Sequence, residues 1–200
     1  MLFRSYRSSS PRSYTDALAV AAAVDAPLET LNITPVVDAA ISNWEVTDKL
    51  RIGNLCARAR MMALFDASSE HGGVVVGTSN LSERCLGYGT LHGDLACAFN
   101  PLGNLLKTEL RQLAVHIGVP AGVIEKPPTA DLWTDQTDEG ELGFSYEMAD
   151  RVLHLRVRAG LQESEIARIV GEPNTVKAIL ARVARFEFKS APTPLGPPPA

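Results

Sequence analysis

The sequence from 74 to 107 reads VVVGTSNLSERCLGYGTLHGDLACAFNPLGNLLK, an apolar run followed by a polar turn and two helical patterns around a Gly-rich loop. Its first residues, Val74–Val76, are β-branched, too few for a helix and followed by glycine, which predicts a buried strand. Residues 77–80 then supply a turn and a helix cap, so hydroxyls and free backbone N–H groups follow the strand directly. α/β folds bind phosphorylated ligands at this carboxyl edge of the sheet. The stretch therefore predicts an α/β fold with a phosphate-binding edge.

Three charged side chains belong to the same stretch. Glu83 is expected one turn into the first helix, and Mg²⁺ usually takes one or two carboxylates together with phosphate oxygens and water. Lys107 lies off the apolar face of the second helix, and a lysine at a phosphate edge binds as a point charge. Asp94 lies in the loop between the two helices. The alternative is that Glu83 and Lys107 are ordinary helix residues in contact with water.

Composition limits the class of protein. The 200 residues are 46% hydrophobic and 21% charged, which predicts one soluble globular domain without a membrane span. The net charge of -4 argues against a protein whose main partner is nucleic acid. Neither the 3 cysteines nor the 4 histidines have metal-ligand spacing. The cysteines are expected to be reduced thiols of a cytoplasmic protein.

Hydrophobic periodicity predicts the remaining elements. Helices are expected over 15–24, from Pro35 onward, and over 54–67, 104–117, 146–158, 162–170 and 173–185, with a strand over 28–33. Alternation of strands and helices up to Lys107 predicts a mostly parallel sheet with helices on both faces. The domain is expected to span 1–189, followed by a Pro-rich, extended tail over 190–200.

Two segments allow a second interpretation. The first fourteen residues are rich in Arg and Ser and lack acidic residues, as mitochondrial transit peptides do. The last two predicted helices, separated by Gly171, resemble a helix-turn-helix with a mild basic excess, which would suit contact with a DNA backbone. Helix pairs of this kind are far more often packing units, so no nucleic-acid partner is expected.

Residues 125–143 contain two consecutive prolines and many acids but no usable periodicity, which predicts a long functional loop that closes over a site as a lid. Arg58 and Arg60 are two residues apart on a predicted helix and therefore point to different faces. One of them can be solvated while the other reaches a ligand or a partner subunit.

Several motifs occur together in this order. They are Gly53-Asn54, Ala57-Arg58, Arg60-Met61, Gly77-Thr78, Ser82-Glu83, Gly87-Tyr88, Gly93-Asp94, 100–103 (NPLG), Lys107-Thr108, 125–133 (EKPPTADLW), 136–139 (QTDE) and 141–143 (ELG). Over nearly the whole chain this pattern resembles the NAD synthetases, both the ammonia-using enzymes and the synthetase domain of the glutamine-dependent ones. The resemblance implies an adenine nucleotide α-hydrolase-like parallel sheet with helices on both faces.

The resemblance also implies an activity, that of an NAD(+) synthase, which is a carbon–nitrogen ligase. Deamido-NAD is adenylated by ATP with Mg²⁺, and ammonia then displaces AMP to give NAD. The family further implies a homodimer with dinucleotide sites between subunits. Leu91 and Ala98 replace a lysine and an aspartate common in ammonia-using relatives, so this loop is closer to the glutamine-dependent variant.

Specific residues match the family's sites. ATP contacts are implied for Thr78, Lys107 and Thr129, and the metal ligand is implied to be Glu83. Deamido-NAD contacts are implied for Arg58, Asp94 and Lys189. Asp94 and Lys107 are the implied catalytic residues, because a carboxylate can favour ammonium and accept its proton while an ammonium stabilises charge at the α-phosphate.

The family begins with a buried strand and a Ser-Gly-Gly-x-Asp-Ser loop that holds pyrophosphate, and nothing in this chain matches that loop. The nearest hydroxyl cluster, 8–10, has no glycine and precedes Pro11. We therefore expect a domain truncated at its amino terminus, with Met1 to Phe3 belonging to an internal strand and with no turnover by this chain alone. The alternatives are a non-catalytic remnant that binds dinucleotide or dimerises, and another adenylating amidotransferase of the same superfamily.

Overall fold

The computed structural model describes residues 1–133, 136–191 and 196, and it begins with a parallel βαβ unit. Strand β1 (Leu2–Ser5) pairs with strand β2 (Glu29–Asn32), with Leu2 opposite Glu29 and Ser5 opposite Asn32. Helix α1 (Pro11–Ala23) connects the two strands. The expected strand at the start of the chain and the expected strand within 28–33 are therefore both present.

Local capping explains where α1 begins. The Ser10 side chain accepts a hydrogen bond from the Arg12 N–H, and Pro11 occupies the first turn, where its missing donor costs nothing. These signals start the helix before the predicted Thr15. The Phe3 and Tyr14 rings lie 5.3 Å apart between centroids and pack α1 against β1.

Helices α2 (Thr34–Asn43) and α3 (Lys49–Glu70) form a small core with the ends of the two strands. Its buried members are Tyr6, Ile33, Val37, Cys56 and Ala59. Helix α3 is longer than the predicted 54–67, because the Asp48 side chain caps it by accepting a hydrogen bond from the Arg51 N–H.

The predicted strand at Val74–Val76 is wrong as a sheet strand. Within the described residues this segment makes one isolated parallel bridge, between Val76 and Phe99, and joins no sheet. Val75 is buried, but Val74 and Val76 are 64% and 49% exposed. A β-branched run becomes a regular strand only when a neighbouring strand pairs with its backbone, and the bridge supplies such pairing at one point only. The α/β class with a parallel sheet is nevertheless confirmed, since β1 and β2 are parallel.

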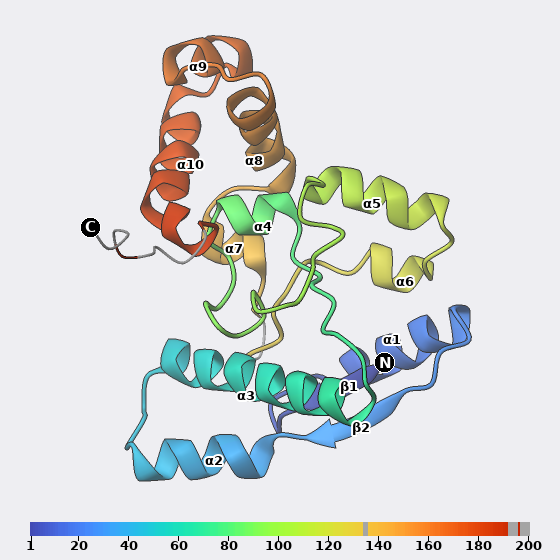
Figure 1. Cartoon of the computed structure of the whole chain (residues 1–200). Coiled ribbons are helices and arrows are strands. Elements are labelled where there is room, and N and C mark those ends of the chain that lie inside the picture. The colour runs from blue at the N-terminus through green and yellow to red at the C-terminus, as the bar shows by residue number, and fades with distance from the viewer. Residues whose placement is uncertain (134–135, 192–195, 197–200) are drawn as a thin grey trace.

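Four short helices follow in the middle of the chain. They are α4 (Leu81–Cys85), α5 (Lys107–His116), α6 (Ala121–Ile124) and α7 (Asp138–Leu142). Figure 1 shows them between the β1, β2 and α1–α3 part of the molecule and a helical unit at the other end. Helix α5 begins later than the predicted 104, since the turn at Leu102–Leu105 precedes it. Helix α7 lies within the predicted loop 125–143.

The C-terminal unit consists of α8 (Tyr146–Leu153), a π-helical turn (His154–Arg158), α9 (Glu163–Val170) and α10 (Pro173–Phe186), which ends in a 3₁₀ turn (Glu187–Lys189). These bounds agree closely with the three predicted helices. The main core lies between this unit and the middle helices, and consists of Leu86, Leu106, Leu142, Tyr146, Ala149, Val152, Leu153, Ile166, Val176 and Ile179. Most of the expected tail 190–200 lies outside the described residues. In the described part of the chain, no helix combines the length and apolar character needed to cross a membrane.

The first prediction compares two isoleucines of α9. Ile166 is fully buried in the main core, whereas Ile169 is 50% exposed on the same helix. Ile166→Ala is expected to lower the free energy of unfolding by about 2–5 kcal/mol, because it removes buried methyl groups and leaves a cavity. Ile169→Ala is expected to cost less than about 1 kcal/mol. Urea denaturation of both variants measures this, and equal losses would contradict the described core.

Candidate active site

A cavity of about 1250 Å³ lies between β1, α3 and the loops that precede α4 and α5. Six of the seven residues expected at the site line it, namely Thr78, Glu83, Asp94, Lys107, Thr129 and Lys189. The exception is Arg58, which is exposed on α3, while its neighbour Arg60 faces the cavity. As expected, one of the two arginines faces solvent and the other does not: Arg58 is exposed, and Arg60 faces the cavity.

An ion pair joins α4 to α5 at the cavity wall. The Lys107 ammonium lies 2.7 Å from Glu83 Oε1, and both side chains are about one-fifth exposed, at 20% and 17%. The other Glu83 oxygen accepts the Asn80 N–H at 3.1 Å, and Asn80 accepts the Glu83 N–H at 3.0 Å. This reciprocal capping box fixes Glu83 in the first turn of α4, as the cap residues 77–80 predict.

The aromatic ring of Tyr146 lies beside the same ammonium. Lys107 Nζ is 5.3 Å from the centroid of this ring, within the range of a cation–π contact. Tyr146 is fully buried, and its hydroxyl donates to Asp138 Oδ2 at 3.1 Å. Burial, followed by the charge of Asp138, raises the pKa of Tyr146, so the hydroxyl stays protonated.

Asp138 is a buried acid of the cavity wall. Burial raises the pKa of its carboxyl, and the hydrogen bond from Tyr146 opposes that rise. Within the described residues its Oδ1 has no hydrogen-bond partner, although the side chain is only 4% exposed. Nearby, Tyr88 donates to Glu141 at 3.2 Å, and burial raises the pKa of Tyr88 as well. On this side of the cavity, the protonated hydroxyls of Tyr146 and Tyr88 therefore donate hydrogen bonds to Asp138 and Glu141.

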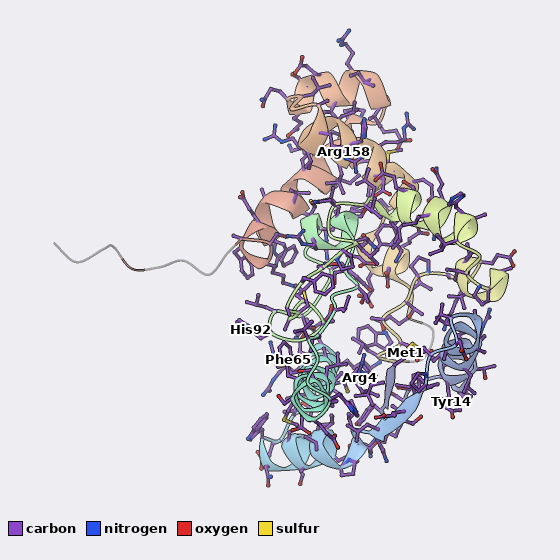
Figure 2. The ribbon with its side chains drawn as sticks, turned by 45° about the vertical axis from the view of Figure 1, so that its right-hand side comes forward. Met1, Arg4, Tyr14, Phe65, His92 and Arg158 are labelled. Atoms are coloured by element: carbon purple, nitrogen blue, oxygen red, sulfur yellow. The ribbon has the colours of Figure 1, made fainter. Side chains whose placement is uncertain are left out.

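Two arginines line the opposite side of the cavity. Arg60 donates to the Arg4 carbonyl at 3.1 Å and to the Ser9 hydroxyl at 3.3 Å, and Figure 2 shows Arg4 on the side of β1 that faces α3. Burial, and then the charge of Arg60, lower the pKa of Arg4 to about 10. In the described part of the chain neither arginine has an acid within ion-pair distance. Two partly buried cations without a counter-ion favour binding of an anion.

Lys189 ties the end of the chain to the Gly-rich loop. Its ammonium donates to the carbonyls of Gly87 at 2.8 Å and Gly89 at 2.7 Å, and burial lowers its pKa. Gly87 has a φ of +62°, and a Cβ there would lie 2.2 Å from Phe186 Cβ, so only glycine fits. Asp94 lies in the same loop and accepts the Thr90 N–H at 2.8 Å.

The loop that carries Thr129 is fastened to α1. Asp131 accepts hydrogen bonds from the Ser10 N–H at 2.9 Å and from the Ser13 hydroxyl at 2.8 Å. Lys126 adds an ion pair with Asp16 at 2.9 Å. The Thr129 hydroxyl itself accepts the Asp131 N–H at 3.0 Å. Residues of this loop thus line one side of the cavity, and its closure as a lid stays a prediction.

Sequence reasoning missed several residues that line the cavity or lie behind its wall. Arg4 carried no signal, because an arginine in a short strand is usually read as exposed. Asp138 belongs to the QTDE motif but received no role. Tyr146 and Asp150 are four apart on α8, on the same face as buried Ala149 and Leu153. An acid on an apolar helix face was the signal that could have identified Asp150.

The fold and the cavity define the class of protein. A parallel βαβ unit and a cavity lined by arginines and lysines favour an α/β enzyme that binds anionic substrates. Comparisons agree with this class. The sequence profile of the family described as NAD synthase matches residues 3–193. The chain therefore belongs to the NAD synthase family, as the motifs predict, and its class of enzyme is a carbon–nitrogen ligase.

Individual relatives support this assignment. The chain is 45% identical over 184 residues to the NH₃-dependent NAD(+) synthetase of Trichlorobacter lovleyi. The aligned region covers 92% of this chain and 67% of the relative. It thus spans about two thirds of the length of the curated relatives that it matches.

Solved structures agree with this fold. The structure of NMN synthetase from Francisella tularensis has a TM-score of 0.83 and 29% identity, over 98% of this chain and 77% of that one. The NH₃-dependent NAD synthetase of Campylobacter jejuni has a TM-score of 0.79 and 31% identity, with the same coverage.

The second prediction concerns pH and Asp138. Because its pKa in the folded chain is raised above the ordinary 3.8, the folded state binds this proton more tightly than the unfolded state does. The free energy of unfolding therefore falls as pH rises from about 4 through the raised pKa. Asp138→Asn removes this contribution but keeps an acceptor for Tyr146. Urea denaturation from pH 4 to 8 should show the variant gaining stability relative to the parent chain, and parallel pH profiles would refute this.

Proposed function

We propose that this cavity serves the ATP-dependent amidation of deamido-NAD to NAD, with ammonia as the nitrogen donor. A nicotinate carboxylate oxygen attacks the α-phosphorus of ATP, and the bond to pyrophosphate breaks to leave an adenylate. The nitrogen of ammonia then bonds to the acyl carbon, AMP departs, and the nitrogen loses a proton. The observation that carries the proposal is the Lys107–Glu83 pair at the wall of a large cavity in a member of this family.

Electrostatics supports nucleotide substrates. ATP and deamido-NAD are both polyanions, and the cavity is lined by Arg4, Arg60, Lys107 and Lys189. Arg4 and Arg60 have lowered pKa values caused mainly by burial, and a phosphate between them would supply the missing counter-charge. Lys107 would stabilise charge that develops at the α-phosphate during adenylation.

Glu83 is the proposed Mg²⁺ ligand. Among the described residues no group of three His, Cys, Asp or Glu side chains could hold a metal by itself. A single carboxylate at a cavity wall still fits Mg²⁺, which takes its other ligands from phosphate oxygens and water. When bound, the ion would neutralise phosphate charge. Glu83 Oε1, which pairs with Lys107, would be the oxygen shared with the ion, because Oε2 caps α4.

The other assignments follow the family pattern. Thr78 and Thr129 are proposed to position ATP, and Asp94 and Lys189 to contact deamido-NAD from the Gly-rich loop and the chain end. Asp94 is exposed at the cavity wall, where it can attract ammonium and accept the proton that nitrogen releases. Arg58 is exposed on α3, so its proposed contact with deamido-NAD would be made across a subunit interface.

A mononucleotide substrate is a second candidate. It is favoured by the likeness in fold to the NMN synthetase of Francisella tularensis. Nicotinate mononucleotide carries the same carboxylate as deamido-NAD but lacks the adenylate half, so it would leave part of the cavity empty. Direct competition between the two acceptors in one assay distinguishes the candidates.

The third prediction tests the activity. Pyrophosphate release from ATP and NAD formation are measured with deamido-NAD or nicotinate mononucleotide and with ammonium salt or glutamine. The missing match to the Ser-Gly-Gly-x-Asp-Ser loop predicts no turnover by this chain alone; where turnover is detected, deamido-NAD with ammonia is expected to give the highest kcat/KM. Lys107→Ala and Glu83→Gln should each lower the rate roughly 30- to 1000-fold, equivalent to about 2–4 kcal/mol of lost transition-state stabilisation.

The matched control is Lys177→Ala, since Lys177 is exposed on α10 and carries the same charge as Lys107. Unchanged rates in both the Lys107 and Glu83 variants would disprove their roles. Binding of deamido-NAD to the parent chain without pyrophosphate release would instead support a non-catalytic remnant.

We also propose a homodimer that uses the outer face of α3. Arg58, Met62 and Phe65 lie four and three residues apart, hence on one face, and Met62 and Phe65 are 52% and 39% exposed. Exposed apolar side chains around an arginine are typical of interface centres. The free cysteines are consistent with a proposed cytoplasmic location.

The fourth prediction concerns this interface. Met62→Glu is expected to shift the protein from dimer to monomer, because it buries a charge without a partner. Val115→Glu changes an apolar residue of α5 that is 65% exposed, against 52% for Met62, and should leave the dimer intact. Sedimentation velocity, with and without deamido-NAD, measures both. A parent chain that stays monomeric under both conditions would exclude the dimer.

A further inference from the structure

Asp150 of α8 is a buried acid with both oxygens engaged, and it lies outside the residues assigned above. Its Oδ1 accepts the Ser82 hydroxyl, and its Oδ2 accepts the Thr108 N–H at 2.8 Å. The side chain is only 3% exposed. A buried carboxylate is costly unless each oxygen has a donor, and Asp150 meets that condition with donors from two different helices.

Each donor is a neighbour of a residue in the ion pair. Ser82 precedes Glu83 in α4, and Thr108 follows Lys107 in α5. The Ser82 hydroxyl also accepts the Lys107 N–H at 2.8 Å, so one oxygen links both helices. Ser82 is fully buried, which keeps water from replacing these bonds.

The side chain of Tyr146 completes this arrangement. Tyr146 and Asp150 are four residues apart on α8 and therefore share a face. The ring of Tyr146 lies 5.3 Å from the Lys107 ammonium, while Asp150 fixes the backbone at the start of α5. One face of α8 thus contacts the Lys107 ammonium through Tyr146 and fixes the backbone beside Lys107 through Asp150.

We propose that Asp150 is a positioning residue that holds Lys107 and Glu83 at ion-pair distance, acting through Ser82 and the first turn of α5. Asp150 is not among the residues that line the cavity. Asparagine cannot replace it, because its amide has one acceptor oxygen, whereas Asp150 receives two donors on opposite oxygens. The catalytic consequence rests on the proposed function of Lys107 and Glu83, but the geometric claim does not.

The geometric claim is tested by lysine acylation, which needs no enzymatic activity. Lys107 and Lys126 are matched, with side chains 20% and 23% exposed and carboxylate partners at 2.7 and 2.9 Å. The folded chain is treated with limiting N-acetoxysuccinimide, and the ratio of acetylated Lys107 to acetylated Lys126 is measured by peptide mass spectrometry. Asp150→Asn and Ser82→Ala should raise this ratio on the order of tenfold, as expected when hydrogen bonds to a charged group are lost.

Two variants calibrate the assay. Glu83→Gln should raise labelling of Lys107 alone, and Asp16→Asn should raise labelling of Lys126 alone, because each removes one partner carboxylate. An unchanged ratio in both the Asp150 and Ser82 variants would overturn the proposal. Equal increases at Lys107 and Lys126 would also overturn it, since they would indicate a general loosening of the fold.

Kinetics then tests the catalytic consequence. Asp150→Asn should lower kcat for adenylate formation roughly 10- to 100-fold with less than about threefold change in KM for deamido-NAD. The double variant with Lys107→Ala should be no slower than Lys107→Ala alone, since Asp150 acts through that lysine. Additive losses would overturn this step. If the parent chain shows no turnover, as the missing Ser-Gly-Gly-x-Asp-Ser loop predicts, the labelling result alone decides the position of Asp150.

Discussion

The Lys107–Glu83 ion pair is the interaction on which the arrangement of this site depends. It joins two short helices, α4 and α5, neither of which is long enough to be stable alone. A half-buried pair is stronger than a surface pair but costs more to desolvate, so it persists only when other bonds fix both partners. The capping box fixes Glu83, and Ser82, Asp150 and Tyr146 fix Lys107.

The cavity combines two electrostatic environments. On one side Arg4 and Arg60 lie close together, and burial lowers the pKa of both. On the other side burial raises the pKa values of Asp138, Tyr88 and Tyr146, which favours their neutral forms. The buried arginines therefore place positive charge where phosphates are proposed to bind, away from the buried acid and phenols of the other side.

Sequence patterns identified local features better than long-range ones. Helices α8 to α10 follow from periodicity and from Gly171, and Glu83 was placed correctly because residues 77–80 are a strong cap signal. Val74–Val76 failed as a strand because pairing depends on neighbours far away in sequence, which β-propensity does not encode. The positions of Asp150 and Arg60 likewise depend on tertiary contacts: Asp150 accepts from Ser82 and Thr108, and Arg60 donates to the Arg4 carbonyl.

The two oxygens of Glu83 explain how one carboxylate can serve both structure and the proposed catalysis. Oε2 caps α4 through the Asn80 N–H, and this bond keeps the side chain directed at the cavity whatever Oε1 contacts. A cation at Oε1 would weaken the bond to Lys107 without releasing Glu83 from the helix. The Tyr146 ring would still attract the ammonium, so Lys107 would remain at the cavity wall with donors free for a phosphate. Glu83 would then hold the ion while Lys107 keeps its ammonium at the cavity wall, so the two side chains could serve different parts of a bound nucleotide.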